Sequence, residues 1–321
     1  ELAAITQNMN EGLLLLNDRQ HILSINDSAA KLFSIQSEAA LGKNILTLER
    51  GKEVQELLQK VADSGSGESL YQKDGRYYQL CGSSVGGRGS LLLIFDVTEK
   101  MAAETLRREF SANVSHELKT PLQSILGYAE IMKNGLVQEA DKQRFLEKIY
   151  NEAGHLIILI DNIMKLSRLD EATGSGSNFE PVELKKLSEA TAARLVSQAE
   201  KKSVTITVSG CEAEIEGVPS VLSEVIYNLV DNGIKYNREG GRVEVVVSVS
   251  PGEAVLTFKD TGCGISAADR ERVFERFYRV DKSHFKETGG TGLGLSIVKH
   301  GVLFHKGRIE LESELEKGTT I

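Results

Sequence analysis

Ser115-His116-Glu117-Leu118-Lys119-Thr120-Pro121 places a lone histidine beside a carboxylate in a segment of helical period. Histidine is mostly neutral at cytoplasmic pH, so one ring nitrogen keeps a free lone pair while the other carries a proton. Glu117 is expected to hold that proton, which makes the free nitrogen of His116 a better nucleophile. An isolated His-Glu pair is more often two solvated helix residues. A reactive histidine therefore needs support from the rest of the chain.

Two long amphipathic helices are predicted around this stretch. Apolar or small side chains recur every three or four positions at Leu106, Phe110, Val114, Leu118, Leu122, Ile125, Ala129 and Met132. After a polar turn at Asn134-Gly135, a second series comprises Leu146, Ile149, Ala153, Leu156, Ile160 and Ile163. The spacing of about 3.5 residues predicts a left-handed supercoil. One hairpin cannot cover this much apolar surface, so we expect a homodimer with a four-helix bundle.

The composition is that of a protein with several globular domains. At 321 residues the chain has room for about two or three cores. A net charge of -8 without a basic cluster argues against direct binding of nucleic acid. The three cysteines lack metal-binding companions, which fits a reducing cytoplasm. No apolar run approaches the length of a membrane span, and both ends look cut, so we expect the cytoplasmic portion of a membrane-anchored protein.

The segment from residue 1 to about 98 alternates short apolar runs with turn signals. Strands are predicted at residues 13–16, 21–25, 76–80 and 90–95, and helices at 28–33 and 52–62. A Gly- and Ser-rich loop at residues 64–67 precedes the third of these strands. This mixed α+β order resembles a PAS sensor domain, which implies a ligand or another signal, or a ligand-free relay, at this end.

The segment from about 99 to 172 is the helical hairpin, and a Gly- and Ser-rich linker at residues 172–178 follows it. Beyond the linker, residues 179–321 mix predicted helices at 182–201, at 220–237 and from 293 with predicted strands at 204–208, 242–249, 254–260 and 308–313. This is the pattern of an α/β sandwich, a mostly antiparallel sheet with helices on one face. Its last strand is expected to be cut short by the C-terminal end.

One predicted helix of this last segment carries polar side chains on a single face. Glu224, Asn228, Asn232 and then Lys235 or Tyr236 recur at spacings of three and four. Oxygen atoms of amide and carboxylate groups suit Mg²⁺, which usually keeps waters and substrate phosphates as further ligands. The alternative is a polar stripe exposed to water.

Two glycine-containing turns follow. The first, after a predicted strand, contains Asp260, Gly262 and Gly264, where a carboxylate can accept a hydrogen bond from an exocyclic amine and glycines let a flat base approach. The second opens an apolar helix, whose first amides can cradle phosphates; it contains Gly290, Gly292, Gly294 and Leu295. Between the two lies an aromatic cluster at residues 274–279.

These clusters, together with residues 115–121, resemble the five sequence boxes of the sensor histidine kinases of two-component systems. The resemblance extends from about residue 100 to the C-terminus. It implies that His116 is autophosphorylated, that Glu117 acts as the base, and that Thr120 orients water when the kinase dephosphorylates its partner. It further implies ATP and Mg²⁺ as cofactors, a Bergerat-type (GHKL) nucleotide domain, and the receiver domain of a response regulator as the partner.

The same resemblance assigns the nucleotide contacts. Asn228 matches the magnesium ligand with Glu224 as a helper, and Asp260 the adenine contact, with Gly262 and Gly264 shaping the pocket. The other implied contacts are Asn232, Lys235, Tyr236, Gly290, Gly292, Gly294 and Leu295. Residues 279–290 would form a mobile lid, with Lys282 and Lys286 as candidates to touch the γ-phosphate.

Two alternatives remain, and one position departs from the family. A GHKL-type ATPase would share the nucleotide fold but lack a phosphorylatable histidine on a dimeric hairpin. A non-catalytic signalling scaffold would bind ATP without phosphoryl transfer. Gly233 stands where the family often has alanine, a change that costs up to about 1 kcal/mol of helix propensity.

Overall fold

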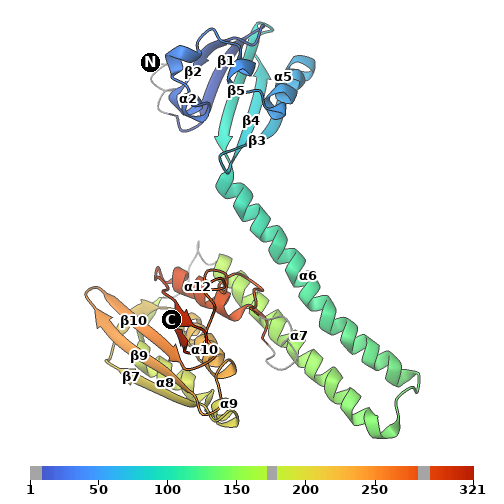
Figure 1. Ribbon diagram of the computed structural model, residues 1–321, viewed down its shortest axis with the longest axis vertical. Helices are drawn as coiled ribbons and strands as arrows, with labels where there is room; N and C mark the ends of the chain where they lie inside the picture. Colours follow the sequence, from blue (N-terminus) through green and yellow to red (C-terminus); the bar gives the residue numbers. More distant parts are fainter. Residues whose placement is uncertain (1–8, 172–178, 281–289) are drawn as a thin grey trace. The chain divides into compact units, whose positions relative to one another are not determined.

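The computed structural model describes residues 9–171, 179–280 and 290–321. The predicted linker at 172–178 and the lid residues 281–289, including Lys282 and Lys286, lie outside these ranges. The chain divides into two compact units, Glu1–Glu109 and Phe110–Ile321. Figure 1 shows the order of their elements. Among the described helices, none combines the length and the apolar character that a membrane span requires.

The first unit is a five-stranded antiparallel sheet with short helices packed against it (Figure 1). The strand order is β2-β1-β5-β4-β3. The strands are β1 (Gly12–Asn17), β2 (Ile22–Ile25), β3 (Ser66–Lys73), β4 (Arg76–Ser84) and β5 (Gly89–Asp96). The helices are α2 (Asp27–Leu32), α3 (Ser37–Ala40), α4 (Ile45–Leu48) and α5 (Lys52–Ser64). Leu14, Leu57 and Leu92 belong to the single apolar core that joins them.

Strand β3 corrects the sequence-based expectation of a loop that leads directly into β4. Residues 66 and 67, placed in that loop, already pair with Ser83 and Gly82 of β4. The reason is that β3 is an edge strand whose side chains are mostly exposed, with Tyr71 the buried exception. An edge strand of this kind lacks the alternation of apolar and polar residues by which strands are recognised.

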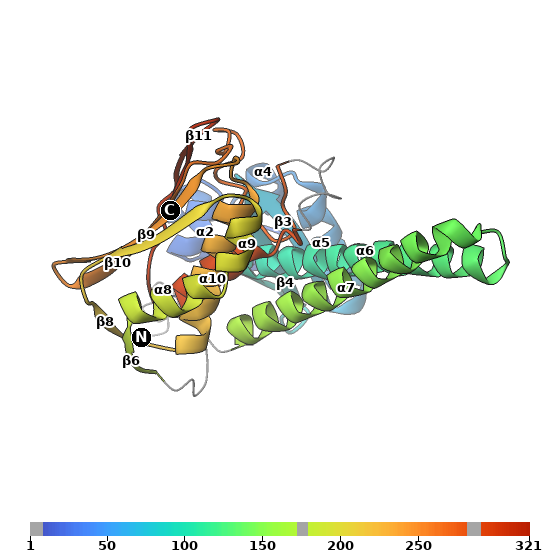
Figure 2. The same cartoon turned by 90° about the horizontal axis from the view of Figure 1, so that it is seen from below.

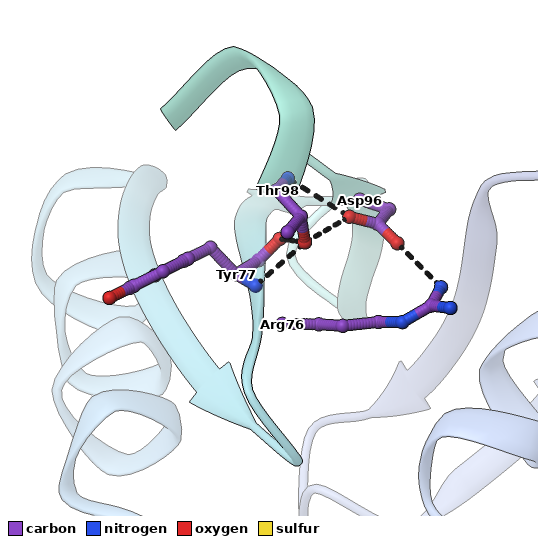
Figure 3. A network of polar contacts seen from close by, with 4 residues as sticks. All are labelled: Arg76, Tyr77, Asp96 and Thr98. Carbon is purple, nitrogen blue, oxygen red and sulfur yellow. Dashed lines mark hydrogen bonds and ion pairs between the residues drawn. The ribbon is translucent and has the colours of Figure 1, made fainter. Parts of the chain in front are cut away.

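Helix α6 (Thr98–Lys133) begins in a network of polar contacts at the end of β5 (Figure 3). Asp96 accepts hydrogen bonds from the backbone N–H of Thr98 at 3.0 Å and from its hydroxyl at 2.6 Å. Arg76 donates to the other carboxylate oxygen at 3.2 Å, and the N–H of Tyr77 donates to the Thr98 hydroxyl at 2.9 Å. The hydrogen bonds from Thr98, and after them the hydrogen bond and charge of Arg76, hold the pKa of Asp96 below its usual range. Asp96 thus caps α6 and ties it to β4.

The helical hairpin of α6 and α7 (Lys142–Glu171), joined through the short helix η1 (Glu139–Asp141), confirms the two-helix prediction. Tyr128 of α6 meets Phe145 of α7 edge to face, with ring centroids 5.6 Å apart. Both helices leave apolar side chains in water: Leu122 and Leu126 are 57% exposed, and Ile157 is 61% exposed. This surface is available to a second hairpin.

The C-terminal part confirms the α/β sandwich. Its sheet has the order β11-β12-β10-β9-β7, in which β7 runs parallel to β9 and the other pairs are antiparallel. The strands are β7 (Thr205–Gly210), β9 (Arg242–Ser250), β10 (Glu253–Asp260), β11 (Glu312–Glu314) and β12 (Gly318–Thr320). The helices are α8 (Leu184–Ala193), α9 (Val196–Lys201), α10 (Pro219–Lys235) and α12 (Gly294–Phe304). Helix α10 lies against the sheet (Figures 1 and 2), and its Ile226 and Val230 share one apolar core with Val245 of β9.

Two predicted elements of this part differ from the structure. The helix expected at 182–201 begins only at Leu184, because β6 (Glu180–Glu183) pairs with β8 (Glu214–Gly217) and Glu183 caps the N–H of Lys186 at 3.2 Å. A turn at residues 194–195 then separates α8 from α9. The strand expected at 308–313 begins only at Glu312, where pairing with β12 starts.

Candidate functional site

A cavity of about 760 Å³ lies beside α10, the turn after β10 and the start of α12. Its size is typical of small-molecule sites. Three clusters that are far apart in the sequence converge on it, through Glu224, Asn228, Asn232, Lys235, Tyr236, Asp260, Gly264, Gly290, Gly292, Gly294 and Leu295. Gly262 is absent from the wall that the described residues form, but its N–H donates to Asp260 at 2.8 Å.

Helix α10 presents its polar face to the cavity because its apolar face is buried. Val225, Ile226 and Val230 are covered by the domain core. The Asn228 Nδ2 donates to the Glu224 carbonyl at 2.8 Å, and its Oδ1 lies 3.0 Å from the point where a Cβ on Gly294 would be. The Asn228 side chain is therefore held with its oxygen directed at the first turn of α12.

The donor set at this end of the cavity fits Mg²⁺. The Asn228 Oδ1 and the Glu224 carboxylate supply oxygen only, which a hard cation prefers. Over the described ranges there is no cluster of three or more His, Cys, Asp or Glu side chains that could hold a metal by itself. Two protein ligands are enough when waters and nucleotide phosphates complete the shell.

The C-terminal end of α10 supplies two further predicted contacts. Lys235 forms an ion pair with Asp231 one turn earlier, at 2.7 Å. Tyr236 follows the helix, 46% exposed, and its hydroxyl lies 3.3 Å from the Cβ position of Gly290. Both residues line the cavity, and Tyr236 lies where the glycine-rich turn begins.

Asp260, the last residue of β10, is oriented by two backbone amides. Its Oδ1 accepts the N–H of Gly262 at 2.8 Å and that of Thr319 at 3.3 Å. Burial raises the pKa of this carboxyl, and the two hydrogen bonds oppose the rise. Both bonds use the same oxygen, so Oδ2 remains to accept from a donor such as an exocyclic amine.

Close backbone contacts require glycine at the turns. A Cβ on Gly264, whose φ is +68°, would lie 2.0 Å from the carbonyl oxygen of Glu314. A Cβ on Gly292, whose φ is +70°, would lie 2.9 Å from the backbone of Phe277. The second contact brings the glycine-rich turn close to the aromatic cluster, and the first residues of α12, Gly294 and Leu295, line the cavity.

The predicted acceptor residues lie on α6 and take no part in the cavity wall among described residues. The His116 side chain is 80% exposed, and its Nδ1 lies 3.7 Å from the Glu117 Oε1. This separation is longer than a hydrogen bond, although such contacts often tighten when substrate binds. The Thr120 hydroxyl donates to the His116 carbonyl at 3.2 Å, so both residues share one face of α6.

Residues of α7 were missed by sequence reasoning. Asn162 donates to the Thr291 hydroxyl at 3.1 Å, and Lys165 forms an ion pair with Glu224 at 2.8 Å. Both line the cavity beside Asp161. In the sequence they read as the polar face of an amphipathic helix, and no local signal distinguishes them from solvated residues.

Models of three domain families match the chain. The PAS fold matches residues 1–86, the His Kinase A (phospho-acceptor) domain residues 106–172, and the histidine kinase-, DNA gyrase B- and HSP90-like ATPase residues 217–321. The three matches fall in turn on the N-terminal sheet unit, on the α6–α7 hairpin and on the C-terminal part that contains most of the cavity residues.

Whole-chain comparisons find similar proteins. Sensor histidine kinase WalK of Bacillus subtilis is 33% identical over the whole chain, which covers 54% of that protein. A sensor protein kinase WalK of Staphylococcus aureus is 30% identical, and the chain covers 79% of it. The chain thus spans about half the length of several curated relatives. Histidine kinase ThkA, solved in complex with response regulator protein TrrA, has the same fold with a TM-score of 0.53 and 22% identity, over 99% of this chain and 96% of that one.

Proposed function

Because the chain belongs to the sensor histidine kinases of two-component systems, we propose that it transfers the γ-phosphoryl group of ATP to His116 and then to an aspartate of a response regulator. One observation carries this proposal. The three glycine- and amide-bearing clusters converge on a single cavity, while an exposed histidine is carried by the adjoining hairpin. An ATPase of the gyrase and chaperone type has no use for such a histidine.

In the first transfer, from ATP to His116, the residues of the chain bind and orient the nucleotide and hold the imidazole proton in place. The lone pair of the His116 Nε2 forms a bond with the γ-phosphorus as the bond from that phosphorus to the bridging oxygen breaks, and ADP leaves. The proton stays on Nδ1, the nitrogen that faces Glu117. A carboxylate there stabilises the positive charge that the imidazole gains.

The nucleotide would be held by the residues already described. Asp260 would accept from adenine through Oδ2, and the first amides of α12 would contact phosphate. Asn228 and Glu224 would hold Mg²⁺, which neutralises charge on the transferring phosphoryl group. Asn232, Lys235 and Tyr236 border the same space.

We further propose a homodimer through the α6–α7 hairpin, because its exposed leucines and isoleucines are too extensive to remain in water. Sedimentation that shows only monomer at micromolar concentration would contradict this. The Thr120 hydroxyl, on the face of His116, supports a second activity that removes phosphate from the regulator. The membrane anchor and the signal at the PAS-like unit stay predictions.

The decisive experiment is incubation with γ-labelled ATP, followed by tests of the acid and base lability of the label. The wild-type chain should gain an acid-labile, base-stable label, and His116→Gln should lose it while it still binds nucleotide. His155→Gln, which removes the other histidine of the hairpin, is the matched control and should keep the label. Label that persists in His116→Gln refutes the assignment.

Variants of the cavity separate this proposal from its rivals. Asn228→Ala and Asp260→Asn should lose nucleotide binding or turnover although His116 is intact. Phosphate release without phosphohistidine would favour a GHKL-type ATPase, and nucleotide binding without either activity would favour a signalling scaffold. Mixing His116 and Asn228 variants would show whether one protomer phosphorylates its partner.

A further inference from the structure

The side chain of Lys165 forms an ion pair with Glu224, the carboxylate of the proposed metal site. Its Nζ is 2.8 Å from the Glu224 Oε1, and the two side chains are 41% and 31% exposed. Glu224 is one helical turn before Asn228 and belongs to the same cavity wall. Lys165 comes from α7 of the hairpin, whereas Glu224 comes from α10 of the nucleotide domain.

An ammonium group and a divalent cation compete for one carboxylate. When Glu224 is paired with Lys165, its charge is neutralised and one oxygen is occupied. A cation that takes Glu224 as a ligand must displace the ammonium group or bind the other carboxylate oxygen beside it, at a cost in repulsion between the two cations. Binding of the metal at Glu224 therefore weakens the contact between α10 and α7. By linkage, that contact weakens metal binding to the same extent.

We propose that Lys165 is a positioning residue that holds Glu224 away from the metal, so that metal-loaded nucleotide releases this wall of the cavity from α7. The inference rests on the proposed ATP site and adds its regulation. Lys165 acts through Glu224 and is not itself a catalytic residue. The hairpin thereby sets how much Mg²⁺ the nucleotide site requires.

A second contact between α7 and the nucleotide domain allows Lys165 to be replaced without loss of the interface. The Arg276 guanidinium donates to both oxygens of Asp170 at 2.9 Å, and the His300 Nδ1 lies 3.2 Å from the same carboxylate. Phe110 of α6 lies under Arg276, with the guanidinium 4.9 Å from the ring centroid. Loss of the Lys165 charge leaves this contact intact, so a variant is expected to stay folded.

The test measures binding rather than turnover. The full chain is titrated with a non-hydrolysable ATP analogue that carries a fluorophore on its ribose, in EDTA and at increasing MgCl2. Lys165→Met should lower the half-saturating Mg²⁺ concentration about two- to fivefold, the range that a half-exposed ion pair supports. Lys165→Arg should restore the wild-type value. Lys142→Met, which breaks an ion pair with Glu139 at the start of α7, is the matched control and should change nothing.

The Glu224→Gln background identifies the route. There, Lys165→Met should have no further effect on the Mg²⁺ requirement, because the carboxylate through which it acts is gone. An unchanged Mg²⁺ requirement in Lys165→Met overturns the inference while wild-type binding leaves the ATP site in place. Weaker binding of Lys165→Met in EDTA also overturns it, since Lys165 would then contact phosphate directly. Failure of the wild-type chain to bind the analogue overturns both proposals.

Discussion

The proposed phosphoacceptor face of α6 and the proposed nucleotide cavity are built in opposite ways. The His116 side chain is 80% exposed, and its pair with Glu117 is wider than a hydrogen bond. At the cavity, backbone atoms lie 2.0 and 2.9 Å from the Cβ positions of Gly264 and Gly292, and Asp260 is oriented by two amides. The cavity residues are therefore preorganised for binding. The proposed acceptor pair of His116 and Glu117 becomes ordered only when a domain, a nucleotide or a second hairpin binds beside it.

The largest test of this contrast is one substitution made in both places. Gly264→Ala should abolish nucleotide binding and cost about 3 kcal/mol or more, because its φ is +68° and the new methyl group would lie 2.0 Å from a carbonyl oxygen. Gly127→Ala on α6 should instead stabilise by up to about 1 kcal/mol, since no described atom other than its chain neighbours and the nearby backbone of α6 lies within 4 Å of its Cβ position. Thermal melting and nucleotide titration measure both. Equal effects at the two sites would remove the contrast.

A smaller effect is expected at Gly233, where the structure explains the departure from the family pattern. A Cβ there would lie 2.9 Å from the Val243 Cγ2, because α10 packs closely on β9. Gly233→Ala should therefore lower the free energy of unfolding by about 1 to 3 kcal/mol despite the gain in helix propensity. Denaturant unfolding measures this. A stabilised variant would show that the helix and the sheet can move apart.

Acid should weaken the unit Phe110–Ile321 through three half-buried histidines, one on α7 and two on or just after α12. Burial is the first cause that lowers the pKa of His155, His300 and His305. Such residues are neutral in both states above about pH 6.5, and below it the unfolded chain takes up protons first, so stability falls. We expect the free energy of unfolding, measured in urea, to fall between about pH 7.5 and 5.5.

His305 provides the control for this pH effect. Its Nε2 accepts the backbone N–H of Val218 at 2.9 Å, just before α10, and its Nδ1 lies 2.7 Å from the carbonyl oxygen of Gly301. The ring must be neutral to make both contacts. His305→Gln should be less stable at pH 7.5 and lose part of the acid dependence. An identical pH curve would assign the effect to other groups.

What the sequence could predict follows the same division. Residues that were predicted from their own type and spacing do line one cavity, as in the polar face of α10 and the glycine-rich turn at the start of α12. Residues whose role depends on a distant partner were not predicted. Lys165 pairs with Glu224, and Gly233 packs against Val243. In both cases the partner is distant in the sequence, so no local sequence pattern predicts the contact. The edge strand β3 was missed because its side chains are mostly exposed.

The smallest effects are expected where α6 is held, at its first turn. Asp96→Ala removes the cap and should cost about 1 kcal/mol, with faster amide exchange at the start of the helix. Asp96→Asn keeps an oxygen that can accept from Thr98 but loses the charge that faces Arg76. The Arg76 ion pair is largely exposed, so this variant and Arg76→Ala should each stay within about 0.5 kcal/mol of the wild type. If Asp96→Asn instead matches Asp96→Ala, charge rather than capping holds the helix. The ion pair between Asp96 and Arg76 would then hold the first turn of α6, in contrast to the exposed side chain of His116 further along the same helix.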